Sequence, residues 1–231
     1  MKGFMLLFSV IATSASAFAQ DSLMKLWYDK PAGNVWEAAL PIGNGRIAAM
    51  VYGNTGHELI QLNESTVWSG GPNRNDNPHA LAALPEVRRL IFEGKNPEAA
   101  KLAEQTIQSE KINGMAFQPV GDLNLNFPGQ DAVEDYHREL DIQKAVAGTS
   151  YTSNGVRYHR EIFASIPDQV MVMLLTADKP GSLNFTASLS SPQKGRVSVE
   201  KNELMFSGIS GDLEGVKGRV KFRTILKIKT S

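Results

Sequence analysis

The feature that most constrains this chain is a series of short apolar segments that fills its second half. Residues 123–127 alternate between apolar and polar side chains, which is the period of a strand with one buried face. Turn signals separate such segments, and Asn154-Gly155 is the strongest short signal for a hairpin. The run 170–176 is almost continuously apolar, as is typical of a central strand buried on both faces. Many short strands at this spacing predict a mainly β fold, a large antiparallel β-sandwich.

The stretch from Trp36 to Pro72 carries short apolar runs bounded by glycine-rich turns. Residues 47–52 and 58–62 are expected to form a hairpin across a short loop, and residues 66–68 a third short strand. Polar residues and tryptophans lie at the turns rather than on the runs. This pattern indicates a sheet edge that presents side chains to something outside.

Helical signals interrupt the β pattern between about residues 77 and 112. Asn77-Pro78 and Asn96-Pro97 each combine an N-cap residue with a proline at the first helical position. Gly94 separates the two segments, and apolar residues recur in both at helical spacing. We therefore expect a β-sandwich with a two-helix insertion whose helices cover a sheet.

Composition excludes several classes of protein. Lys+Arg and Asp+Glu both number 24, so the formal net charge is zero, and no run of Lys and Arg suggests a nucleic-acid binder. The chain has no cysteine, which excludes disulfides, thiolate chemistry and Cys-ligated zinc. The apolar share of 42% is typical of a globular core.

Residues 1–19 have the pattern of a signal peptide. Lys2 supplies a positive charge, an apolar run follows, and Ala17-Phe18-Ala19 has the small-x-small form of a cleavage site before Gln20. The run is shorter than the roughly 20 residues that span a membrane. We expect an exported protein, periplasmic or extracellular, with a single domain over residues 20–231.

The sequence supports neither a dinucleotide-binding site nor a histidine metal site. Residues 43–48 fit the relaxed dinucleotide pattern G-x-G-x-x-A. That fingerprint needs a preceding strand and a long following helix, but Pro41 lies where the strand would end and Gly53 arrives too soon. None of the four histidines forms H-x-x-x-H or H-E-x-x-H, so no metal site is expected.

The acidic residues invite comparison with glycosidases, which generally need two carboxyl groups flanking the scissile bond. The candidates are dispersed along the chain, and no spacing singles out a pair: Glu37, Glu64, Asp122 and Glu161. Because acids are usually exposed, solvated or turn-capping carboxylates are the favoured interpretation.

Trp36 and Trp68 lie beside polar residues in the sequence. Aromatic rings can stack on the C–H faces of sugars while amides and acids bind the hydroxyls, but aromatic residues and arginine are also what protein interfaces use. An interface is favoured over direct sugar contact. The candidates for a substrate site or a domain interface are Trp36, Glu37, Asn44, Arg46, Asn63, Glu64 and Trp68.

The same stretch carries a family resemblance. WEAALPIGNGRIAAMVYG at 36–53 and ELIQLNESTVWSGGP at 58–72 resemble the N-terminal domain of glycoside hydrolase family 95, the α-L-fucosidase family. QPVGDL at 118–123, YHRE at 158–161 and FASIPD at 163–168 agree with it, so the resemblance covers the chain from about Leu26 to its end. It implies a many-stranded super-sandwich placed before an (α/α)6 helical barrel.

The resemblance also implies a function. It suggests hydrolysis of terminal α-linked fucose with inversion and without a cofactor, by groups of a barrel that would lie beyond Ser231. No position here matches those motifs, so no catalytic residue is assigned and this chain alone is expected to be inactive. The expected partners are the catalytic barrel and a fucosylated glycan at the domain boundary, with no nucleic acid. A stand-alone carbohydrate-binding module and a structural interaction domain are the alternatives, and glycan binding by the isolated chain would separate them.

Overall fold

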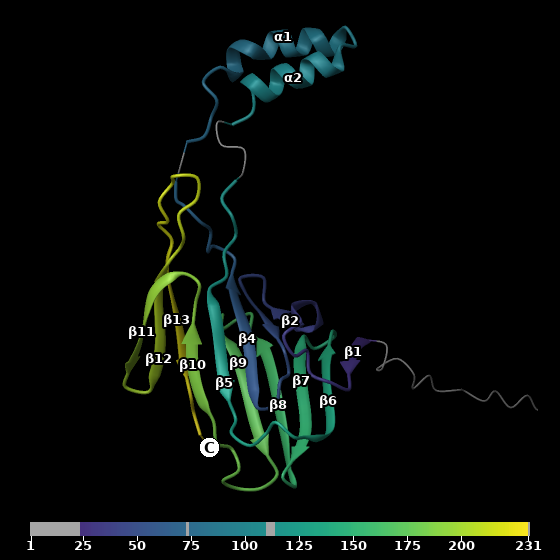
Figure 1. Cartoon of the computed structure of the whole chain (residues 1–231), viewed down its shortest axis with the longest axis vertical. Helices are drawn as coiled ribbons and strands as arrows, with labels where there is room; N and C mark the ends of the chain where they lie inside the picture. The colour runs from purple at the N-terminus through teal and green to yellow at the C-terminus, as the bar shows by residue number, and fades with distance from the viewer. Residues whose placement is uncertain (1–23, 73, 110–113, 231) are drawn as a thin grey trace, which may run out of the picture.

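The computed structural model describes residues 24–72, 74–109 and 114–230, and within them the regular structure is mainly antiparallel β-sheet (Figure 1). The first sheet has the order β1-β6-β7-β8-β9, formed by Lys25–Tyr28, Glu134–Asp141, Val146–Ser153, Val156–Ala164 and Met171–Ala177. The second has the order β10-β5-β4-β3-β2, formed by Thr186–Ser190, Gly121–Asn126, His57–Glu64, Ile47–Val51 and Leu40–Gly43. The third has the order β11-β12-β13, formed by Lys194–Glu200, Glu203–Ile209 and Lys221–Lys227. The predicted mainly β fold with two inserted helices is confirmed.

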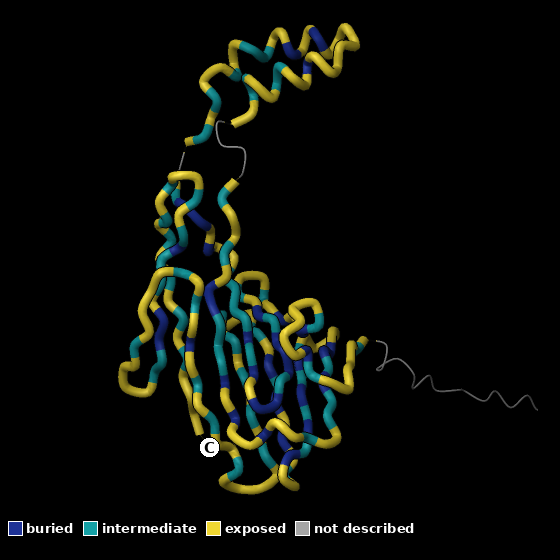
Figure 2. Tube along the Cα trace, in the orientation of Figure 1, coloured by how far each residue is buried: buried dark blue, intermediate teal, exposed yellow. Residues whose placement is uncertain are grey.

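The core lies between the first two sheets, where alternate residues of both point inward. Figure 2 shows the buried residues concentrated along the facing strands. The cluster takes residues from both sheets: Leu40, Ile42, Ala49, Val51 and Ile60 from the second, Leu140, Ala147 and Ile162 from the first. Period-two alternation places these side chains on one face and leaves their neighbours for the outer faces.

The hairpin expected at Asn154-Gly155 is confirmed. β7 ends at Ser153 and β8 begins at Val156, so the loop has two residues. Both have positive φ, 51° at Asn154 and 69° at Gly155, as a turn matched to the twist of the strands requires. This turn therefore sets the register between the two strands.

The apolar run 170–176 is the strand that the sequence analysis placed wrongly. It forms β9 at the edge of the first sheet, paired only with β8 among the described strands. Its side chains alternate between half-buried and exposed, and Leu174 is 51% exposed. An apolar run shows that both faces are apolar, but it does not show whether a neighbour covers each face.

The third strand expected at residues 66–68 is also absent. β4 continues to Glu64, and the chain then turns, with the Val67 N–H donating to the Glu64 carbonyl. Trp68 makes only an isolated bridge with Phe117. The turn forms because Glu64 accepts a hydrogen bond from the Thr66 N–H, which competes with continued strand pairing.

The helices are α1, Ala80–Phe92, and α2, Asn96–Thr106. They pack on each other through a small cluster of their own and stand away from the sheets, so the expectation that they cover a sheet is wrong (Figure 1). The Asn77 side chain does not cap α1; it accepts a hydrogen bond from the His79 N–H and donates one to the Gln108 carbonyl, which ties the two ends of the insertion together.

The predicted cap at Asn96 is wrong as well. Asn96 is the first residue of α2, and no side-chain hydrogen bond caps that helix. The proline at the next position still fits, because its missing N–H costs nothing in the first turn.

The predicted signal peptide, residues 1–19, lies outside the described residues. Within the described part of the chain, neither helix has the length and apolar character needed to cross a membrane.

Candidate functional site

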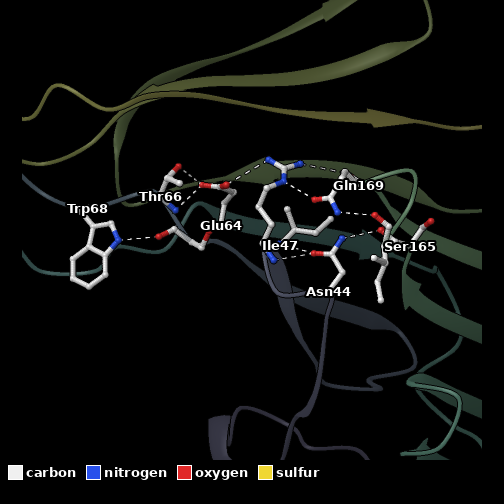
Figure 3. A network of polar contacts seen from close by, with 10 residues as sticks. Asn44, Ile47, Glu64, Thr66, Trp68, Ser165 and Gln169 are labelled. Carbon is white, nitrogen blue, oxygen red and sulfur yellow. Dashed lines mark hydrogen bonds and ion pairs between the residues drawn. The ribbon is translucent and has the colours of Figure 1, made fainter.

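The turn between β2 and β3 is held by one asparagine. Asn44 Oδ1 accepts hydrogen bonds from the N–H groups of Arg46 at 3.1 Å and Ile47 at 2.9 Å. Its Nδ2 donates to the Ser165 carbonyl at 2.8 Å, which joins the turn to the segment between β8 and β9 (Figure 3). Gly45 has a φ of 90°, a conformation that favours glycine. The sequence Gly-Asn-Gly therefore builds a fixed turn that bridges the two main sheets.

Arg46 extends this bridge. Its Nε donates to Gln169 Oε1 at 2.7 Å, and its side chain forms a 3.4 Å ion pair with Glu64. The other Glu64 oxygen accepts from the Thr66 N–H at 2.8 Å and from its hydroxyl at 2.5 Å. Both Glu64 oxygens are thus engaged, and the carboxylate links the Arg46 turn to the turn that follows β4.

An aromatic pair lies next to this polar network. The Trp68 Nε1 donates to the Ser65 carbonyl at 2.8 Å, and the indole meets Phe117 edge to face with ring centroids 5.5 Å apart. The exposed fractions are 44% for Trp68 and 46% for Phe117. The network holds the backbone beneath a half-exposed aromatic surface, which can stack on a sugar or pack against a protein.

The structure separates the seven candidates. Asn44, Arg46, Glu64 and Trp68 belong to the network of Figure 3 or border it, and Asn63 precedes Glu64 on β4, opposite Ala48. Trp36 and Glu37 form a 3-10 helix before β2 and so lie at the other end of that strand from the turn. The sequence did not show that the candidates before and after β2 lie at opposite ends of that strand, because β2 has only four residues.

Two of the four candidate carboxylates, Asp122 and Glu161, lie on opposite sides of the two main sheets, whereas burial and then the charges of Asp122 and Glu37 raise the pKa of Tyr52. Asp122 lies on the outer face of the second sheet, since its neighbour Leu123 packs against the core. Burial raises the pKa of Asp122, although a hydrogen bond with Gln61 acts to lower it. Glu161 lies on the outer face of the first sheet, 3.2 Å from His159. The two main sheets therefore stand between Asp122 and Glu161, which cannot flank one glycosidic bond.

Sequence reasoning missed a buried ion pair between the sheets. Arg160 is 3.0 Å from Glu58, and their side chains are 3% and 0% exposed. Arg160 also donates to the carbonyls of Asn54 at 2.6 Å and Thr55 at 2.7 Å, and bonds the Tyr151 hydroxyl. Its guanidinium lies 4.0 Å from the centre of the Phe127 ring. The alternation of side chains along β8 could have predicted this burial, because residue 160 lies on the face of the strand that points into the core.

The pKa values of this cluster follow from burial. Burial raises the pKa of Glu58, while the Arg160 guanidinium and the Gly53 N–H act in the opposite direction. Burial also raises the pKa of Tyr151 to about 12. Because every group here is hydrogen-bonded and shielded from solvent, the cluster stabilises the fold and is not open to a substrate. Over the described residues, no group of three His, Asp or Glu side chains could hold a metal ion.

Residues 26–231 match the family described as Glycosyl hydrolase family 65, N-terminal domain. Alpha-L-fucosidase 2 of Arabidopsis thaliana is 42% identical over 174 residues, 73% of this chain. Probable alpha-fucosidase A of Aspergillus niger is 30% identical over 74% of the chain, and that of Aspergillus oryzae is 30% identical over 71%. The chain spans about a fifth of the length of these relatives: 20% of the Arabidopsis protein and 22% of the Aspergillus niger protein.

These matches confirm the resemblance to the N-terminal domain of an α-fucosidase family, and the matching domain family carries the number 65. The match covers both main sheets, the helix pair and the third sheet. The chain therefore belongs to the glycosyl hydrolase family 65 N-terminal domains, in the form found in relatives named as α-fucosidases.

Proposed function

We propose that this chain is the non-catalytic N-terminal domain of an exported α-L-fucosidase-like enzyme that acts on fucosylated glycans. In this proposal the domain packs against a helical barrel that supplies the catalytic groups. The relatives named as α-fucosidases support it, since they are about five times as long as the matched region. The separation of Asp122 from Glu161 by the two sheets supports it too, because an inverting glycosidase needs two carboxyl groups roughly 6.5–9.5 Å apart across the bond.

The observation that carries the proposal is the exposed apolar surface of the helix pair. α1 and α2 pack on each other and project from the sandwich (Figure 1). Leu81 is 83% exposed and Phe92 is 88% exposed. The two residues are eleven positions apart on α1, on one side of the helix and about 16 Å apart along its axis. Exposed large apolar side chains on a projecting element indicate an interaction surface. We propose that this surface packs against the catalytic part of the enzyme.

The aromatic pair near the turn suits a second contact with the same catalytic part. Trp68 and Phe117 are half exposed, and the Arg46 network holds the backbone beneath Trp68. Aromatic anchors on a rigid backbone lose little conformational entropy on binding. This contact is also where a glycan at the domain boundary would meet the domain.

A chimera tests the proposal. This domain replaces the matched region of the Arabidopsis alpha-L-fucosidase 2, and hydrolysis of an aryl α-L-fucoside and thermal unfolding are measured. The chimera should be active, and this chain alone should be inert. The double variant Leu81→Glu/Phe92→Glu should lower activity and the unfolding temperature of the chimera, because each buried side chain of this size contributes about 1.5–3 kcal/mol.

A control variant carries a charge change on the same helix pair. Lys101 is an exposed polar residue of α2, so Lys101→Glu should leave both measurements unchanged. If the double variant behaves like Lys101→Glu, the helix pair does not pack against the catalytic part. Fucoside hydrolysis by the purified chain alone that is lost on mutation of Glu64 or Asp122 would place the active site within this domain.

A further inference from the structure

The third sheet gathers four cations on one face. In its register, Lys194 and Lys221 flank Ile209, and one pleat further Arg196 and Arg223 flank Ser207. Residues two apart along a strand point to the same face, so all four side chains share it with Ser207 and Ile209. The four residues are named here the cation face. It arises from two strands that are separate in the sequence, and for this reason no basic cluster is visible in the sequence itself.

Among the described residues, no acidic side chain forms a direct ion pair with the cations of this face. All four are exposed, and none forms a side-chain hydrogen bond or an ion pair with a described residue. Two other lysines around the same sheet are paired, Lys227 with Glu203 and Lys217 with Asp212, both at 2.7 Å. Asp212 also feels the charge of Lys194, but only as the weakest influence on its pKa, which the hydrogen bond from Lys217 lowers most.

A shallow depression of about 670 Å³ is lined by these four residues together with Gly195, Ser207, Gly208, Ile209 and Phe222. The glycines are required by the opposite face. A Cβ on Gly195 would lie 2.4 Å from the Phe206 ring, and one on Gly208 would lie 2.6 Å from both Phe206 and Phe222. The register and these contacts place both aromatic rings on the opposite face, and the four cations share the cation face with Ser207 and Ile209.

We propose that the cation face binds an anionic polysaccharide through its sulfate or carboxylate groups. Cations two residues apart on one strand lie about 7 Å apart, and β11 and β13 are separated by about 10 Å, or two strand spacings. This geometry receives several anionic groups of a repeating polymer. The choice of a carbohydrate among polyanions rests on the proposed function. A single-stranded nucleic acid would instead need aromatic platforms for its bases, and the rings here lie on the other face.

The test compares two variants of equal net charge. Arg196→Glu/Arg223→Glu reverses two charges of the cation face, and Lys217→Glu/Lys227→Glu reverses the two paired lysines. Binding of the full chain to dextran sulfate, alginate and uncharged dextran is measured by titration calorimetry. The wild type and the control should bind one or both anionic polymers and not dextran. The first variant should bind at least about tenfold more weakly, because each exposed charge contact is worth a factor of about 1.5–5 and each reversal adds a repulsion.

Each outcome bears on the proposal. An equal loss in both variants would mean that only net charge matters and would overturn it. Tighter binding to a DNA duplex or to anionic lipid vesicles than to either polymer would overturn it in favour of a different macromolecule. Circular dichroism checks that both variants are folded. The chimera assay uses a neutral fucoside, so failure of this proposal leaves that result untouched, and failure of the chimera leaves polymer binding measurable.

Discussion

Replacing both members of the buried pair Glu58–Arg160 should destabilise the domain less than the sum of the two single replacements. Glu58→Gln keeps the shape and the acceptor for the Gly53 N–H but leaves the Arg160 charge without its partner. Breaking a buried pair from one side costs about 3–5 kcal/mol. Since Arg160 retains two carbonyl partners and the Tyr151 hydroxyl, we expect the low end of that range, about 3 kcal/mol.

Arg160→Met should cost more, because it also leaves the carbonyls of Asn54 and Thr55 without their donor. Each buried group left without a partner adds about 1–3 kcal/mol to the loss from the broken pair. In the double variant Glu58→Gln/Arg160→Met no charge remains unpaired, and only the two carbonyls lose their partner. The double variant should therefore cost less than the sum of the single variants by about 3 kcal/mol or more.

Urea unfolding at neutral pH measures all three variants, with the free energy of unfolding taken from linear extrapolation. A pH series adds a second check. Burial already raises the pKa of Glu58 above its ordinary 4.5, and removing Arg160 raises it further. A raised pKa gives stability that is present at low pH and lost as the pH rises, so Arg160→Met should approach the wild type as the pH falls toward about 4.5. Additive losses, or single losses below about 1 kcal/mol, would refute the reasoning.

Three further outcomes are expected. The hydrogen bond from Lys25 lowers the pKa of Glu139, so its contribution to stability is present above about pH 4.5 and lost below it; Glu139→Gln should flatten the acid side of the stability curve, and an unchanged curve would contradict this. Gly53→Ala should destabilise more than Gly33→Ala, which costs about 1–2 kcal/mol; both have positive φ, but only at Gly53 would a Cβ collide with neighbours, and equal urea midpoints would count against the packing argument. Mass spectrometry of the product exported by a bacterial host should find Gln20 first, whereas an intact N-terminus on that product would reject the predicted signal peptide.

Local signals in the sequence were reliable where one residue decides the backbone. Asn154-Gly155 predicts its turn because both positions need positive φ, which these residues tolerate. The alternation at residues 123–127 also predicts β5 and the face of it that points inward, because successive side chains of a strand point to opposite faces. The existence of each strand is a local property, and its place in a sheet is not.

The features that could not be predicted from the sequence depend on residues far away along the chain. The run 170–176 becomes an edge strand because the first sheet ends there, and no residue of the run encodes that fact. Arg160 becomes buried because the loop before β4 supplies two carbonyls and Glu58 of β4 supplies a carboxylate to it. Exposure expected from residue type fails in such cases, since a charge can be buried once it is fully paired.

The turn at residues 43–48 shows why a short motif needs its structural setting. In a dinucleotide site, backbone N–H groups at the start of a helix stay free to bind phosphate. Here the N–H groups of Arg46 and Ile47 both donate to the Asn44 side chain, and a strand follows instead of a helix. The same side chain satisfies the donors that would bind an anion and turns outward to hold the Ser165 carbonyl. A glycine-bounded turn of this kind therefore joins two sheets, and the N–H groups of Arg46 and Ile47 are not available to a phosphate.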